Sequence, residues 1–84
     1  MGDGIDERVI GIVAEHFGKP IGEITLESRF KEDLNADSLD AVEVNMTIED
    51  AYNVVIPDSE AGNMANVGNM VSYVRARYNP KSSQ

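Results

Sequence analysis

Apolar residues recur at helical spacing in three stretches of this chain, at about residues 5–17, 38–52 and 67–78. This pattern constrains the fold strongly, because steps of three and four residues place apolar side chains on one face of a helix. The chain has 84 residues, enough for one small domain with a single thin core. We therefore predict an all-α four-helix bundle with three longer helices, one short helix and a long loop between the first two helices.

The first two stretches begin and end at residues that are common at helix ends. Asp3 is the expected N-cap of the first helix, and Gly18 is suited to its end. Asp37 is the expected cap of a second helix from about Ser38 to Tyr52, and Asn53 favours a stop there. Both longer helices therefore have defined start and stop positions.

Turn residues divide the rest of the chain. Pro57 and Asp58 are suited to the start of a short helix around residues 59–61, and a last helix begins near Asn66. We assign residues 1–79 to one domain and residues 80–84 to a flexible C-terminal tail.

The segment from about residue 21 to residue 36 has no sustained period. Its apolar residues are spaced irregularly among polar ones, at Ile24, Leu26, Phe30 and Leu34. Long loops without secondary structure are usually functional or disordered. The four apolar side chains favour a loop that is pinned to the core.

The second helix has two apolar faces. With Leu39 at 0° and about 100° per residue, three apolar residues fall at about 140°, 180° and 220°, a core face made of Val44, Ile48 and Tyr52. A second stripe falls on nearly the opposite side and consists of Leu39, Val42 and Met46. One helix of a small bundle rarely needs two such stripes, so the second one is a candidate docking surface.

Acidic residues flank this second stripe, and no basic residue occurs from residue 32 to residue 52. The flanking acids are Asp40, Glu43, Glu49 and Asp50. The formal net charge of -8 disfavours nucleic acid and anionic membranes and favours a protein partner with a Lys/Arg patch. The alternative is that these are ordinary solvated charges around scattered apolar residues.

Ser38 stands at the predicted start of the second helix, where it is either part of a cap or a modified residue. As a catalytic nucleophile it lacks a G-x-S-x-G turn and a base, since the only histidine is His16, which we expect to be structural. A phosphodiester suits this position because a helix N-terminus favours anions. Residues 33–38 begin like a calcium-binding EF-hand loop, but Ser38 and Val44 replace the required Gly and Glu.

The run from Phe30 to Asp40, FKEDLNADSLD, closely resembles the segment around the modified serine of bacterial-type acyl carrier proteins. The resemblance extends without an evident gap from Ile5 to about Val74. It includes Glu7-Arg8-Val9, Ile56-Pro57-Asp58 and Val67-Gly68. It covers most of the chain.

The resemblance implies that a phosphopantetheinyl transferase moves a 4'-phosphopantetheine arm from coenzyme A to Ser38. Asp37 matches the acid that helps hold the metal ion of the transferase. The second helix would be the recognition helix, and its partner-binding residues would be Asp37, Leu39, Asp40, Val42, Glu43, Met46, Glu49 and Asp50. The protein would carry growing fatty acyl chains as thioesters and deliver them to fatty-acid synthesis enzymes, without catalysing a reaction itself.

Several positions depart from the family pattern. Asn45 falls at the edge of the core face, where the family generally has an aliphatic residue. Thr47 replaces a common Ala, Ala51 replaces a common acid, and residues 62–64 replace a more charged stretch. These departures bear on the acyl pocket and on the choice of partners.

Alternative functions are a carrier for a polyketide, peptide or other pathway, or an acidic interaction module without the arm.

Targeting features are absent from the sequence as it stands. It contains no cysteine, no apolar stretch long enough to span a membrane, and no N-terminal pattern of a signal or transit peptide. We expect a cytoplasmic monomer, with a processed organellar protein as the alternative.

Overall fold

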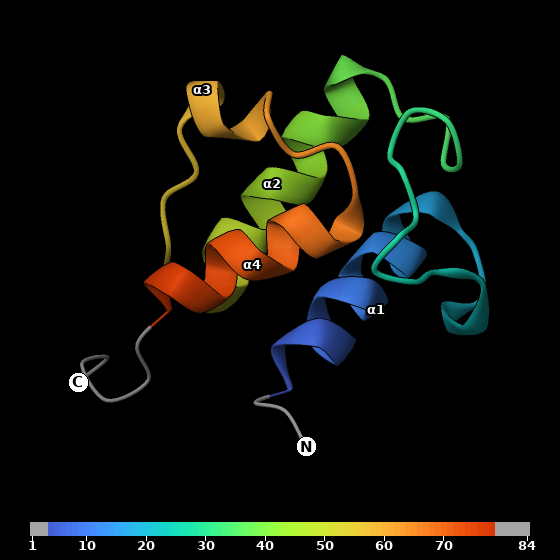
Figure 1. Cartoon of the computed structure of the whole chain (residues 1–84), viewed down its shortest axis with the longest axis horizontal. Coiled ribbons are helices and arrows are strands. Elements are labelled where there is room, and N and C mark those ends of the chain that lie inside the picture. Colours follow the sequence, from blue (N-terminus) through green and yellow to red (C-terminus); the bar gives the residue numbers. More distant parts are fainter. Residues whose placement is uncertain (1–3, 79–84) are drawn as a thin grey trace.

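Residues 4–78 are described by the computed structural model of this chain, and they form a helical bundle (Figure 1). Within this range the only bridge between extended segments is an isolated one that joins Arg29 and Asn66. The elements in chain order are α1 (Ile5–Phe17), the 3₁₀-helix η1 (Ile21–Glu23), α2 (Ser38–Tyr52), α3 (Asp58–Ala61) and α4 (Val67–Arg77). The predicted all-α class, with three longer helices and one short helix, is confirmed. The predicted tail at residues 80–84 lies outside the described residues.

The helix ends follow the sequence with one exception. Gly4 is the N-cap of α1, at a φ of 80° and without a side-chain hydrogen bond, so the prediction that Asp3 caps this helix is wrong. Glycine adopts this left-handed conformation without the steric penalty that other residues meet. Gly18 ends α1 and Asn53 ends α2, both in the left-handed region. Asn66 caps α4 through a reciprocal pair of hydrogen bonds with Asn69.

The core lies where α1 packs against both α2 and α4. Seven side chains are almost completely buried, and they come from all three of these helices: Val9, Val13, Val44, Ile48, Val67, Val71 and Val74. Tyr52, at the end of α2, is also buried, so Val44, Ile48 and Tyr52 form a core face as the helical wheel predicts. Burial of these apolar side chains is the main favourable contribution to folding.

The long loop between α1 and α2 is pinned to the core, as expected, although η1 within it was not predicted. Ile24 and Leu34 are buried, and Leu26 and Phe30 pack partly against the core. The loop backbone also bonds to the start of α4, where Gly68 N donates to Leu26 O at 2.8 Å. A Cβ on Gly68 would lie 3.0 Å from the same oxygen, so this close approach favours glycine.

Side chains also hold the connection between α2 and α3. The Glu49 carboxylate accepts a hydrogen bond from Ile56 N at 2.7 Å, and the Tyr73 hydroxyl donates to Val55 O at 3.1 Å. These bonds position the segment that leads into α3. None of the helices in residues 4–78 has the length and apolar character needed to cross a bilayer.

Candidate functional site

Ser38 is the first residue of α2, and its side chain is exposed. Asp37 immediately before it is the N-cap and forms a capping box with Asp40. Asp37 Oδ1 accepts from Asp40 N at 2.9 Å, and Asp40 Oδ2 accepts from Asp37 N at 3.1 Å. The capping box therefore fixes the backbone on both sides of Ser38 while its hydroxyl stays accessible.

The environment of Ser38 suits a phosphate ester better than nucleophilic catalysis. The first N–H groups of a helix have no intrahelical partner, and the helix dipole is positive at this end. His16, the only histidine in the sequence, makes its hydrogen bond with Asp40 instead of with Ser38. Among residues 4–78 no base is hydrogen-bonded to the Ser38 hydroxyl, and a hydroxyl without such a base is a weak nucleophile that a separate enzyme must activate.

His16 joins α1 to the start of α2. Its Nε2 lies 2.9 Å from Asp40 Oδ1 and 3.8 Å from Glu43 Oε1. The hydrogen bond with His16, together with the one from the backbone of Asp37, holds the pKa of the Asp40 carboxyl below its usual value. The structural role expected for His16 is consistent with this geometry, because the pair orients Asp40 and braces the helix end that carries Ser38.

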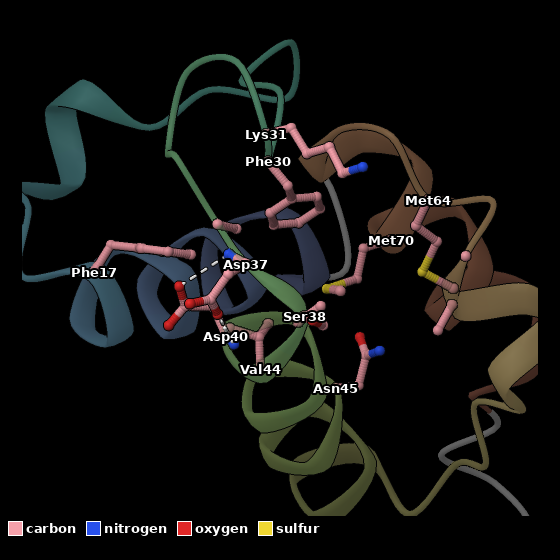
Figure 2. A pocket seen from close by; sticks show the side chains of 14 residues that line it. Phe17, Phe30, Lys31, Asp37, Ser38, Asp40, Val44, Asn45, Met64 and Met70 are labelled. Atoms are coloured by element: carbon pink, nitrogen blue, oxygen red, sulfur yellow. Dashed lines mark hydrogen bonds between the residues drawn. The ribbon is translucent and has the colours of Figure 1, made fainter.

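A cavity of about 480 Å³ opens beside Ser38 (Figure 2). Its wall is formed by α1, the long loop, α2, α3 and the start of α4, with Phe30, Met64 and Met70 among its apolar lining residues. Met70 and Val44 are buried at its inner side, whereas Ser38 is exposed. The cavity therefore leads from the Ser38 hydroxyl toward the core.

Sequence reasoning identified only part of this cavity. Met64 belongs to the stretch at residues 62–64 that was expected to bear on the acyl pocket, whereas Phe17, Ala61 and Met70 were not connected with it. These residues come from three separate helices, and no local motif in the sequence reports that they meet. Their helical spacing identified Phe17 and Met70 only as apolar-face residues.

Asn45 lies in the wall of the cavity, half-buried. In Figure 2 the end of its side chain points toward the space between Ser38 and Met64. The helical wheel placed Asn45 at the edge of the core face, and the structure confirms that position. Among residues 4–78 its side-chain amide has no hydrogen-bond partner.

The second apolar stripe of α2 is exposed, as the wheel predicts. Leu39 is 65% exposed, Val42 is 51% exposed and Met46 is 57% exposed. Only two other large apolar side chains in residues 4–78 are comparably exposed, Ile21 and Val55. The stripe is therefore the largest group of exposed apolar residues along any one helix of the described chain.

The acids around this stripe differ in how far the fold already uses them. Asp40 bonds to His16 and closes the capping box, and Glu49 accepts the hydrogen bond from Ile56. Glu43 is exposed and has His16 at 3.8 Å, and Asp50 is exposed on the outer side of the helix. The predicted partner-binding acids thus include two that also hold the bundle together.

The comparisons with known proteins agree with this geometry. Residues 7–74 match the family described as "Phosphopantetheine attachment site". The chain is 44% identical over 73 residues to "Acyl carrier protein" of Rickettsia bellii (strain RML369-C), covering 87% of this chain and 85% of that relative. It is 47% identical over 75 residues to "Acyl carrier protein" of Rickettsia canadensis and of Rickettsia typhi, covering 89% of this chain and 87% of each relative.

The fold and the family match define a carrier domain whose cofactor is covalently attached 4'-phosphopantetheine. Within that class, the chain belongs to the acyl carrier protein family. The resemblance noted from residues 30–40 is thereby confirmed. The relatives are named as carriers and not as catalysts.

Proposed function

We propose that Ser38 carries the phosphopantetheine arm and that the protein holds growing fatty acyl chains on it for fatty-acid synthesis enzymes. The observation that carries this proposal is the position of Ser38, which is exposed at the start of α2 and beside the mouth of the cavity. An arm attached there reaches solvent in one direction and the cavity in the other. The match over residues 7–74 supports the same assignment.

Attachment of the arm requires an external transferase. The Ser38 oxygen forms a bond to the phosphorus that carries pantetheine, the pyrophosphate bond of coenzyme A breaks, and adenosine 3',5'-bisphosphate leaves. The hydroxyl proton passes to a base of the transferase, because no hydrogen bond within residues 4–78 joins the Ser38 hydroxyl to a histidine of this chain. The arm then supplies a terminal thiol that forms thioesters with acyl groups.

The cavity is the proposed shelter for the acyl chain. Its volume of about 480 Å³ and its lining of Phe30, Met64 and Met70 suit an alkyl chain of moderate length. Transfer of an acyl chain from water to such a lining is favoured by the hydrophobic effect. The arm raises the effective concentration of the chain at each partner enzyme.

The outer face of α2 is the proposed docking surface for the transferase and the synthesis enzymes. Its exposed stripe of Leu39, Val42 and Met46 offers an apolar contact, and the flanking acids attract basic patches on a partner. Attraction between opposite charges accelerates association more than it strengthens the final complex. We further propose that the protein acts as a non-catalytic cytoplasmic monomer. Its cysteine-free composition is compatible with a reducing cytosol.

Reconstitution tests the pathway. The protein is loaded with malonyl-phosphopantetheine from malonyl-coenzyme A and mixed with purified bacterial fatty-acid synthesis enzymes, an acetyl primer and NADPH, and chain growth on the protein is followed by mass spectrometry. We expect successive two-carbon extensions. A loaded protein that these enzymes do not extend, but that polyketide or peptide synthesis enzymes accept, would move the function to another pathway.

A further inference from the structure

Asn45 places a polar group in a cavity whose inner wall is apolar. It follows Ser38 by seven residues, which is about 10.5 Å or two turns along nearly the same face of the helix. Its neighbours at the inner side, Val44 and Met70, are only 2% and 3% exposed. Figure 2 shows the end of the Asn45 side chain directed toward the open space between Ser38, Met64 and Met70.

This amide has unused hydrogen-bonding capacity. An asparagine side chain has two N–H donors and a carbonyl acceptor, and residues 4–78 provide no partner for them. In the open cavity, water satisfies these groups. A saturated alkyl chain that fills the cavity displaces this water and offers no replacement, which opposes its entry.

The position of Asn45 along the cavity determines which part of a bound chain it meets. Its side chain is half-buried, whereas Val44 and Met70 in the same wall are almost completely buried, so the amide lies nearer the open mouth of the cavity than they do. An acyl chain enters with its tail first, because the thioester is tethered to the arm outside. The amide therefore faces the first carbons after the thioester, and the tail passes beyond it.

We propose that Asn45 makes the cavity select acyl chains with an oxygen near the thioester, such as 3-hydroxyacyl groups, over saturated chains of equal length. The amide N–H donates to a hydroxyl or keto oxygen, and the amide carbonyl accepts from a hydroxyl. This inference rests on the proposed attachment of the acyl-bearing arm to Ser38. It deepens that proposal by naming the class of cargo that the chain shelters best.

The test compares three eight-carbon cargoes on the whole protein. A phosphopantetheinyl transferase loads Ser38 from the coenzyme A thioesters of octanoate, 3-hydroxyoctanoate and 8-hydroxyoctanoate. Melting temperatures and the side-chain amide resonances of Asn45 are then measured. We expect the 3-hydroxyoctanoyl form to melt highest and to be the only form that shifts these resonances to positions typical of a hydrogen-bonded amide. One net hydrogen bond should raise the equilibrium constant for entry of the 3-hydroxyoctanoyl chain about five- to tenfold above that of the octanoyl chain.

Two variants assign the effect to Asn45. Asn45→Leu, which is similar in size but apolar, should reverse the order so that the octanoyl form melts above the 3-hydroxyoctanoyl form. Thr47→Val removes a polar group from the exposed side of the same helix and should keep the wild-type order. The melting curve of each variant without cargo establishes that it folds.

Equal melting temperatures for the octanoyl and 3-hydroxyoctanoyl forms, or a preference that survives Asn45→Leu, would overturn the inference alone. An equal gain from 8-hydroxyoctanoate would overturn the placement of Asn45 beside the first carbons. Failure to load any cargo on Ser38 is a different result, because it would overturn the proposed function and the inference with it.

Discussion

Asp40 has two structural tasks at the residue scale, in addition to its proposed place on the docking surface. Its carboxylate closes the capping box at the start of α2 and bonds to His16 of α1. It therefore connects the orientation of the helix end at Ser38 to the packing of α1. A change at Asp40 affects both the helix end and the charge that a partner meets.

The depressed pKa of Asp40 predicts how its contribution to stability depends on pH. The folded protein holds this carboxyl ionised to lower pH than the unfolded chain does, chiefly through His16. The stabilisation by Asp40 is therefore fully present above the ordinary aspartate pKa of about 3.9. It is lost as the pH falls through the lower pKa that Asp40 has in the folded protein. Asp40→Asn, which keeps an acceptor oxygen without the charge, should lower the melting temperature at pH 7 and flatten its decline below about pH 4.

Melting curves of both proteins between neutral and acidic pH measure this difference. Asp50→Asn removes an exposed carboxylate of the same helix and serves as the control. Curves for Asp40→Asn and the wild type that run parallel into the acidic range would contradict the assigned role of the His16–Asp40 pair.

The two faces of α2 perform different tasks at the element scale. Val44, Ile48 and Tyr52 are buried against the bundle, whereas Leu39, Val42 and Met46 are exposed. Burial on one face stabilises the fold, and exposure on the other leaves apolar surface for a partner. Substitutions on the two faces should therefore separate stability from function.

Ile48→Ala should lower the free energy of unfolding by about 2–5 kcal/mol, because it leaves a cavity at a side chain that is 0% exposed. Met46→Ala, whose side chain is 57% exposed, should change the free energy of unfolding by no more than about 0.5 kcal/mol. It should nevertheless slow loading by the transferase. Denaturant titrations and loading kinetics on the same samples measure the two effects. If Met46→Ala unfolds the protein, the assignment of the faces is wrong.

A charge reversal on the outer face tests the electrostatic part of docking. Glu43→Lys should slow loading several-fold at low salt, mainly through the association rate, and added salt should reduce the difference. Glu23→Lys makes the same change in net charge in η1 instead of α2, and it should have a much smaller effect. Equal slowing by both variants would indicate that only the net charge matters.

Acidity affects the stability of the whole molecule as well as its choice of partner. The formal net charge is -8, and no basic residue lies between residues 32 and 52 to offset the acids there. Repulsion among like charges destabilises a compact chain, and salt screens it over about 10 Å at 0.1 M. Added sodium chloride should therefore raise the melting temperature at pH 7. A melting temperature that stays constant from low salt to about 0.5 M, where screening is nearly complete, would show that this repulsion is unimportant.

Most of the local features of this molecule were predictable from the sequence. The helical spacing predicted the buried and exposed faces of α2, and Asp37 and Asn53 marked its two ends. The N-cap of α1 was mistaken because Gly4 replaces a side-chain cap with a left-handed backbone conformation. The N-cap preferences of the amino acids favoured Asp3, because aspartate is more common than glycine at the N-cap of a helix.

The features that depend on several elements were harder to predict. The cavity forms where residues of α1, the long loop, α2, α3 and α4 meet, and its lining residues share no sequence spacing. The hydrogen bond between Glu49 and Ile56 was also missed, because Glu49 was considered only as a flank of the outer stripe. A helical wheel reports the direction of a side chain, and it does not report which loop passes in front of it.

The attachment of the arm to Ser38 is the central claim, and the mass of the intact protein tests it most directly. The wild type, Ser38→Ala and Ser59→Ala are each incubated with coenzyme A and a phosphopantetheinyl transferase. Ser59, on α3, is also exposed and serves as the matched control. We expect the wild type and Ser59→Ala to gain the mass of one phosphopantetheine each, and Ser38→Ala to fold normally and gain none. A phosphopantetheine adduct on Ser38→Ala, or none on the wild type, would contradict the account.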